Sequence, residues 1–414
     1  RGPGCSCLFS SSFPLFLLLL FILHPTIFRE RSWLESQIPL SQVNESSVYV
    51  EYHFSFASRL CIMNTLSEAN GNFAIYLLKM LCENNPSKNV CYSPMSISSA
   101  LAMVLLGAKG DTAVQMSQVS CVSSHTYKDI HQGFQSLLSN LNKPNRKYLL
   151  RMANRLFAES TCEFLPVSYI NRMIDSTPEP WKIPELLLGG SVDSATRLVL
   201  VNALYFKGKW QKEFDKERTR EMPFKINQRE TRPVQMMYQK DVFKLAYVKE
   251  VEAKMLVMPY DGMELSLIVL LPVDGVDLSK VENNLTFEKL MSWTKPDFMR
   301  STRAEVLLPK FKLQEDYDMK SVFQHLGMVD VFQEGKADLS GMSLERNLCV
   351  SECVHKSVVE VNEEGTEAAA STMVNICCYS SGGDPRFCAD HPFLFFIRHN
   401  ETNTLLFCGR FSSP

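Results

Sequence analysis

The sequence predicts one large α+β domain that begins near Met63 and continues to the C-terminus. Apolar stripes with helical spacing fill its first part, and apolar strand-like segments fill most of the rest. No long linker, repeat or low-complexity tract divides it. Of the 414 residues, 45% are hydrophobic and 21% charged, which is ample material for a large buried core.

The helix signals come first along the chain. Ser93-Pro94 predicts a helix start, with a side-chain cap and a proline in the first turn, and Gly107 is placed to end that helix. Three apolar faces predict helices: Phe73, Leu77, Met80 and Leu81; Ile97, Leu101, Val104 and Leu105; and Ile130, Phe134, Leu137 and Leu141.

Strand signals dominate the later part of the domain. Four segments are apolar enough to lie in a buried sheet: Arg197–Phe206, Leu265–Leu271, Val354–Val361 and Phe393–Ile397. Together with the preceding helices they predict a large mixed sheet packed against helices.

Residues 1–62 differ from the rest of the sequence. Residues 15–23 form one unbroken apolar run, which suits the core of a signal peptide and is too short for a comfortable membrane span. Either this stretch is a leader or anchor, or it is not part of the functional protein and Met63 is the natural start. We favour the second interpretation.

Charge and cysteine content limit the possible partners and compartments. The formal net charge is −2, with no Lys/Arg run to gather nucleic acid, so we expect a protein or small-molecule partner. The 13 cysteines are odd in number and include the adjacent Cys377 and Cys378. They do not form the pattern of a disulfide framework, so most are expected to be reduced and buried.

Motifs of common enzymes were not found in the sequence. It contains no G-x-S-x-G, H-E-x-x-H, C-x-x-C, G-x-G-x-x-G or phosphate-loop pattern. Cys349 and Cys353 read as core residues rather than as metal ligands. The sequence therefore predicts no catalytic residue, no metal site and no cofactor.

Residues 363–372 form a tract of mostly small side chains directly after a predicted strand. In an extended chain Thr366, Ala368, Ala370 and Thr372 would all face one side, because side chains alternate with a period of two. A face so small could slip between two existing strands without clashes. A flexible surface loop is the alternative, and composition alone does not decide between them.

Several long stretches resemble the serpin family, in order, over nearly all of residues 63–414. They are NVCYSPMSISSALAMVLLG at 89–107, LVNALYFKGKW at 200–210, LPKFKLQEDYDMKSVFQHL at 308–326, VHKSVVEVNEEGTEAAA at 354–370, and the closing DHPFLFFIRHN…LLFCGRFSSP from 390. Overall the chain most resembles the ovalbumin-like intracellular (clade B) type, near the granzyme-B-inhibitor branch. The resemblance implies the serpin fold, with a large mixed or antiparallel main sheet and an exposed reactive-centre loop.

It also implies a function and site residues. Serpins are suicide substrates for serine proteases, and their cleaved loop inserts into the main sheet. On this resemblance Tyr379-Ser380 is the reactive bond, and Cys378-Tyr379 is the alternative by a count from the other end of the loop. A Tyr before that bond suits a chymotrypsin-like or granule protease. The hinge would be Gly365, Thr366, Glu367, Ala368, Ala369 and Ala370. The shutter beneath the sheet would be Ser93, Ser96, Asn202 and His355. The breach, where the loop first enters, would be Trp210, Glu363 and Lys310, the last two as a surface ion pair.

The stretch from about 158 to 196 departs from the family pattern. The usual amphipathic helix and the following edge strand are largely missing, and Pro166, Pro178, Pro180 and Pro184 disfavour a continuous helix. Two hypotheses therefore stand: a protease inhibitor that is not an enzyme, or a non-inhibitory serpin-fold protein that is inert or a binding scaffold. We expect a monomer in the cytoplasm, with the nucleus as a further compartment, and no membrane contact for residues 63–414. Secretion is the alternative if residues 13–28 act as a signal.

Overall fold

The computed structural model describes the backbone of residues 45–120, 137, 139, 141, 147–158, 196–343, 347–364 and 384–414, and side chains from Thr65 onward. Internal contacts divide the chain into two units, Arg1–Arg59 and Leu60–Pro414. In the first unit only part of the backbone of helix α3 (Glu45–Asn84) is described. Among the described helices, none combines the length and apolarity needed to cross a membrane.

The larger sheet of the second unit has nine strands, in the order β1-β13-β12-β7-β6-β5-β8-β11, with β4 paired to β5. Its strands are β1 (Val90–Tyr92), β4 (Arg220–Lys225), β5 (Thr231–Val248), β6 (Ala253–Pro259), β7 (Leu265–Pro272), β8 (Arg300–Pro309), β11 (Arg386–Cys388), β12 (Phe393–His399) and β13 (Thr404–Phe411). All pairs are antiparallel except β11 with β8, which is parallel.

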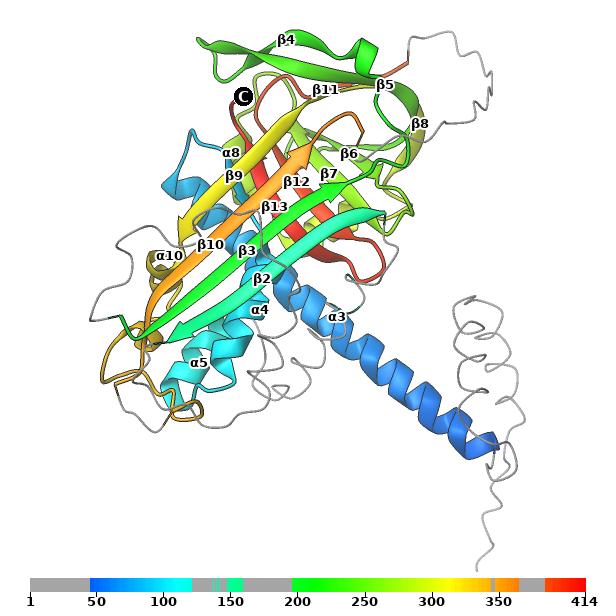
Figure 1. Cartoon of the computed structure of the whole chain (residues 1–414). Coiled ribbons are helices and arrows are strands. Elements are labelled where there is room, and N and C mark those ends of the chain that lie inside the picture. The colour runs from blue at the N-terminus through cyan, green and yellow to red at the C-terminus, as the bar shows by residue number, and fades with distance from the viewer. Residues whose placement is uncertain are drawn as a thin grey trace, which may run out of the picture. The chain divides into compact units, whose positions relative to one another are not determined.

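The smaller sheet has four strands in the order β2-β3-β10-β9 (Figure 1). They are β2 (Tyr148–Ala158), β3 (Leu198–Gly208), β10 (Val350–Val361) and β9 (Phe311–Asp318). The two central strands, β3 and β10, run parallel, whereas each outer strand is antiparallel to its neighbour. Among the described residues β2 has a strand neighbour on one side only.

Helices pack around these sheets. They are α3, α4 (Pro94–Leu105), α5 (Gly110–Val119), α8 (Leu278–Asn284), α9 (Phe287–Trp293) and α10 (Met319–His325), with 3₁₀ turns η2 (Lys216–Arg218) and η3 (Asp330–Phe332). Ser93 caps α4 as predicted, since its hydroxyl accepts the Ser96 N–H at 3.2 Å and Pro94 opens the helix. Gly107 follows the helix end closely and donates its N–H to the Val104 carbonyl.

All four predicted strands are present and form β3, β7, β10 and β12. Every residue of β7 is buried, which explains its unbroken apolar run. The predicted helix face around Phe73 lies in α3, where Phe73 and Leu77 are fully buried. The prediction for Ile130 to Leu141 falls almost entirely outside the described residues, as does the shortened stretch after Ala158.

Arg410 joins the last strand to the end of α3. Its guanidinium is buried and donates to the carbonyls of Cys82, Asn85 and Lys88, close to the helix C-terminus. A salt bridge to Glu282, at 3.1 Å, balances its charge. The last carbonyls of a helix lack partners within the helix, so this arginine satisfies them and fixes β13 against α3.

Candidate functional site

The predicted hinge and reactive bond lie outside the described residues. This applies to Gly365, Thr366, Glu367, Ala368, Ala369, Ala370, Cys378, Tyr379 and Ser380. The structure describes the chain up to Glu364, three residues after β10 ends, and again from Asp384, two residues before β11 begins. The site is therefore built from these two flanks, the proximal end at Glu364 and the distal end at Asp384, and from the strands beside them.

An ion pair holds each end. The Glu364 carboxylate contacts the Lys216 ammonium of η2. At the distal end Asp384 lies 2.9 Å from the Lys240 ammonium of β5, which also contacts Glu305 of β8 at 3.2 Å. The Pro385 carbonyl accepts the Glu305 N–H at 3.0 Å, which begins the β8–β11 pairing. Nineteen residues, 365–383, connect the two ends.

The three predicted breach residues meet at the end of β10. The Trp210 indole N–H donates to the Asn362 carbonyl at 2.8 Å, and the ring stacks on Tyr260 with centroids 4.5 Å apart. Lys310 contacts Glu363 at 2.9 Å. The Glu363 side chain is only 8% exposed, so the expected surface pair has one buried partner.

The electrostatics of Glu363 follow from that burial. Desolvation pushes the pKa of the carboxyl upward, but the hydrogen bond and charge of Lys310 and a hydrogen bond from its own backbone outweigh desolvation, so the net pKa is lowered. Glu363 is therefore ionised at neutral pH. Its carbonyl also accepts the Phe214 N–H at 2.9 Å.

The four predicted shutter residues form one buried hydrogen-bond network where α4 begins beneath β3 and β10. The Asn202 amide of β3 donates to the Ser96 carbonyl at 3.0 Å, and its oxygen faces His355 Nδ1 of β10. The Ser93 N–H donates to His355 Nε2 at 3.1 Å. All four residues are buried, so the network joins both central strands to one helix N-terminus.

His355 is neutral in this network. Because Nε2 accepts the Ser93 N–H, that nitrogen carries no proton, and the ring proton lies on Nδ1 and is donated to Asn202. Burial lowers the pKa of His355 to about 3. Protonation would place an unpaired charge beneath the sheet and break the bond from Ser93.

Three further residues complete the network and were not predicted. Asn154 of β2 donates to Ser99 of α4 at 2.7 Å and accepts from Asn202. Ser357 of β10 donates to the Cys91 carbonyl at 2.6 Å, and the Tyr317 hydroxyl of β9 accepts the Cys91 N–H at 3.1 Å. Each is a polar residue on a strand, and the period-two alternation in β10 places Ser357 on the same face as His355.

The parallel β3–β10 pair has a geometric consequence for the chain that follows it. His355 lies opposite Asn202, and Val359 lies opposite Phe206, so the pairing continues almost to the end of β10. A segment that turns back after β10 would run antiparallel to both β3 and β10. Entering between them, it would replace one parallel pair with two antiparallel pairs, which are slightly more stable per residue.

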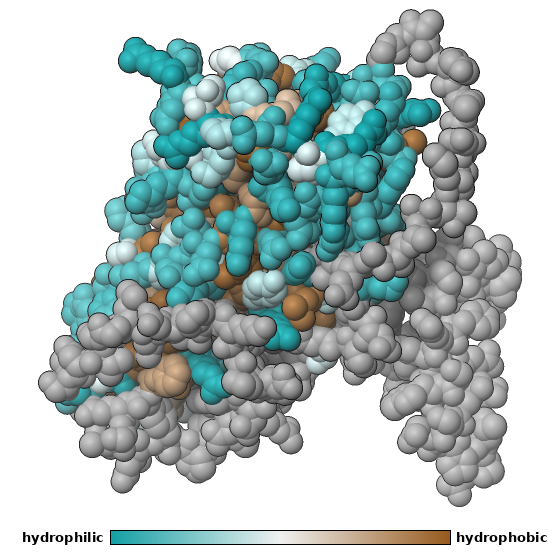
Figure 2. Space-filling view, turned by 45° about the horizontal axis from the view of Figure 1, so that its top comes forward, coloured by the Kyte–Doolittle hydropathy of each residue, from teal (hydrophilic) through white to brown (hydrophobic). Residues whose placement is uncertain are grey.

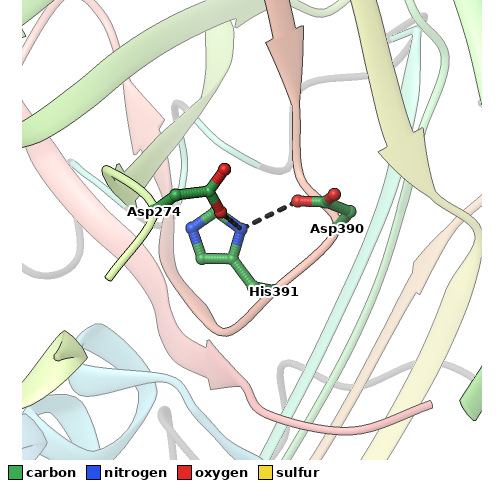
Figure 3. A group of neighbouring side chains, drawn as sticks. All are labelled: Asp274, Asp390 and His391. Carbon is green, nitrogen blue, oxygen red and sulfur yellow. Dashed lines mark hydrogen bonds and ion pairs between the residues drawn. The ribbon is translucent and has the colours of Figure 1, made fainter. Parts of the chain in front are cut away.

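One other group of titratable side chains lies apart from this site. Asp274, Asp390 and His391 bring their side chains together beside the start of β12 (Figure 3). The Lys225 ammonium lies 3.2 Å from Asp274 and 3.6 Å from Asp390 and so occupies the same position that a cation would take. We therefore read this group as an ion-pair cluster.

The described cysteines agree with the predicted core role. Cys82, Cys91, Cys349, Cys353 and Cys408 are buried, Cys388 is partly buried, and all six are free thiols. Burial raises the pKa of both Cys349 and Cys353, which keeps them protonated and unreactive.

Comparison with known proteins places this geometry in a family. Residues 68–179 and 167–414 match the family described as "Serpin (serine protease inhibitor)". Human Serpin B9 is 62% identical over 381 residues, human Serpin B8 51% over 380, and the horse (Equus caballus) leukocyte elastase inhibitor 47% over 381. Each alignment covers 85% of this chain and all of the relative.

Solved structures support the same family at the level of the fold. Uncleaved ovalbumin aligns with a TM-score of 0.75 and 34% identity, covering 84% of this chain and all of the other. Maspin aligns with a TM-score of 0.76 and 32% identity, covering 85% of this chain and all of the other. The predicted serpin fold and ovalbumin-like type are thereby confirmed, and this chain belongs to the serpin family of serine protease inhibitors.

Proposed function

We propose that this chain inhibits a chymotrypsin-like serine protease by acting as a suicide substrate whose cleaved loop inserts between β3 and β10. The observation that carries the proposal is the parallel β3–β10 pair, since the segment that follows β10 can return antiparallel to both strands. Family membership supports the same reaction. The first chemical step is the attack of the protease serine on the carbonyl before the scissile bond, which forms an acyl-enzyme and frees the amine of the next residue.

Insertion is favourable because the loop gains a strand's hydrogen bonds and buries one face. About a dozen new backbone hydrogen bonds at ~0.5–1.5 kcal/mol each supply on the order of 10 kcal/mol. The inward face would hold Thr366, Ala368, Ala370 and Thr372, all of them small and uncharged. A charged side chain on that face would cost several kcal/mol unless it were paired.

We place the reactive bond at Tyr379-Ser380, with Cys378-Tyr379 as the other register. An aromatic side chain before the bond suits the apolar primary pocket of a chymotrypsin-like enzyme. The mass of the C-terminal fragment released by chymotrypsin distinguishes the two registers, because a Tyr379 N-terminus adds one tyrosine to the fragment.

A gel-shift assay tests the proposal. Wild-type protein mixed with chymotrypsin should form a complex that survives SDS, and T366R should be cleaved without forming one. The matched control is E367R, whose side chain would lie on the opposite face and already carries a charge in the wild type. Undiminished inhibition by T366R would exclude insertion.

Heating curves give a second test that does not depend on the complex. Cleaved wild-type protein should melt at a clearly higher temperature than the intact protein, because the inserted strand completes the sheet. Clean cleavage with no complex and no gain in melting temperature would instead indicate a non-inhibitory serpin-fold protein. The expected shortening near residues 158–196 is the observation that favours this alternative.

We also propose the setting in which this function operates. Residues 63–414 would form the functional unit, and residues 1–62 an extension outside it. The protein would act in the cytoplasm as a monomer without enzymatic activity, and without a cofactor or nucleic-acid partner. Mass spectrometry of the N-terminus of the native protein and light scattering of the purified chain check these points.

A further inference from the structure

The distal end of the loop is paired with a residue of β5, and the 3₁₀ turn that holds the proximal end lies against the same strand. Arg218 belongs to the same 3₁₀ turn as Lys216, which holds the proximal end, and its guanidinium lies 4.5 Å over the Tyr238 ring. Lys240, two residues further along β5, holds Asp384 at the distal end. Residues two apart on a strand face the same side. The distal end and the turn that holds the proximal end therefore lie on one face of the larger sheet.

Beyond Lys240 that face is open and polar. The strand register places seven side chains on it, which we call the basic face: Lys240, Val242 and Lys244 of β5, Ser301, Arg303 and Glu305 of β8, and Arg386 of β11. The alternate residues point into the core and are buried, among them Phe243, Val306 and Phe387. Figure 2, in which the end carrying β4, β5, β8 and β11 comes forward, shows hydrophilic residues over most of it.

The charge on this face is unbalanced. Among the described residues of this face and its distal anchor, four cations lie beside two carboxylates, Glu305 and Asp384. Both carboxylates are within 3.2 Å of Lys240, and Asp384 also lies 3.9 Å from Arg303. Lys244, Arg303 and Arg386 are exposed. Val242 lies between these cations and is 61% exposed, so it offers an apolar contact at the centre of the face.

A protease held on this loop is kept close to the surface beside the loop. A connection of 19 residues has a contour of at most ~65 Å, so an arch with both ends fixed rises no more than about 30 Å. A protease of roughly 230 residues is about 45 Å across by the scaling of folded domains. Its body therefore overhangs the sheet face to which the ends are attached.

We infer that the basic face is a second contact surface for the target protease and favours proteases whose surface beside the active site is acidic. The inference rests on the proposed function. It adds a preference among target proteases that the loop sequence does not provide. Opposite charge at close range accelerates association and is weakened by salt, whereas like charge opposes docking. The basic face would act before cleavage and leave the later insertion step unchanged.

The test compares association rate constants for two proteases that both cleave after Tyr379 but carry opposite surface charge beside the active site. K244E/R303E should associate with the acidic-surfaced protease at least tenfold more slowly than wild type at low ionic strength. Its association rate constant should also depend less on salt concentration. With the basic-surfaced protease, this variant should associate faster than wild type. K295E, at an exposed position before β8, is the matched control and should behave as wild type.

A second variant and a second readout separate this inference from the proposed function. R303E also removes the 3.9 Å contact with Asp384, whereas V242E adds a single acid at the centre of the face without touching the Asp384 contacts. V242E should lower the same rate. If the wild type is cleaved without forming a complex, the proposed function fails, and the comparison is then made on kcat/KM for loop cleavage. Wild-type rates for K244E/R303E and V242E with the acidic-surfaced protease, by either readout, would overturn the inference.

Discussion

The Ser93 N–H points at Nε2 of His355 from 3.1 Å, across 262 residues of sequence. This bond joins the first residue before α4 to the middle of β10, and the opposite ring nitrogen of His355 continues it to Asn202 of β3. One neutral imidazole therefore holds both central strands of the smaller sheet above a helix N-terminus. The proposed insertion would part these strands, so it would require this contact to loosen.

The neutrality of His355 predicts an acid-dependent loss of stability. Its folded pKa of about 3 lies below the unfolded value near 6.5, so between these pH values the unfolded chain binds a proton that the folded chain does not. The free energy of unfolding falls as pH is lowered through this window, by up to ~1.4 kcal/mol per pH unit. The stability advantage of wild type over H355Q should thus shrink between pH 7 and pH 4.

Urea unfolding of both proteins at several pH values checks this. H325Q, at an exposed position on α10, is the matched control and should parallel the wild type at every pH. An advantage over H355Q that stays constant with pH would contradict the assignment of a neutral, buried imidazole.

His391 predicts the opposite dependence. Its Nδ1 lies 2.8 Å from the Asp390 carboxylate and its Nε2 lies 2.8 Å from the Pro272 carbonyl, so both nitrogens face acceptors. Burial lowers the pKa of this imidazole, but these acceptors and Asp274 outweigh burial and raise it overall. The stabilisation is complete below the unfolded pKa and is lost as pH rises through the folded one.

An NMR titration of the His391 Hε1 signal measures this directly. The midpoint should lie above the ordinary value near 6.5 and should fall in D390N, which removes the charge but keeps the shape. A wild-type midpoint below 6.5 would show that the ring is not held as an imidazolium.

The ion pair between Lys310 and Glu363 predicts that removing one partner lowers the free energy of unfolding more than removing the other. K310M leaves the buried Glu363 carboxylate without its ammonium partner and should lower the free energy of unfolding by about 1–2 kcal/mol at pH 7. E363Q leaves no buried charge, and Lys310 is 47% exposed and can turn to water, so its cost should be smaller. The urea midpoints of the two variants measure the two losses of stability. Equal losses, or a larger loss for E363Q, would refute the prediction.

The features of this site that the sequence predicts are those set by residues close together in the chain. The Ser93-Pro94 cap and the buried apolar run of β7 are short-range signals, and the structure has both. The register that sets Asn202 opposite His355 joins segments 153 residues apart, and no local pattern encodes it. Family resemblance identified those partners, whereas Asn154 and Tyr317 were missed because a single polar residue on a strand reads equally well as solvent-facing.

The shutter network predicts a graded cost for removing its amides. N202A deletes the side chain that bonds Ser96 and His355 and leaves buried polar atoms without partners, so it should cost about 2–4 kcal/mol. N154A removes an amide at the edge strand β2, which is only half buried, and should cost about 1 kcal/mol. In the double variant the costs should not add, because the two amides bond each other. Unfolding midpoints of the three variants measure the coupling, and strict additivity would mean that the two amides act independently.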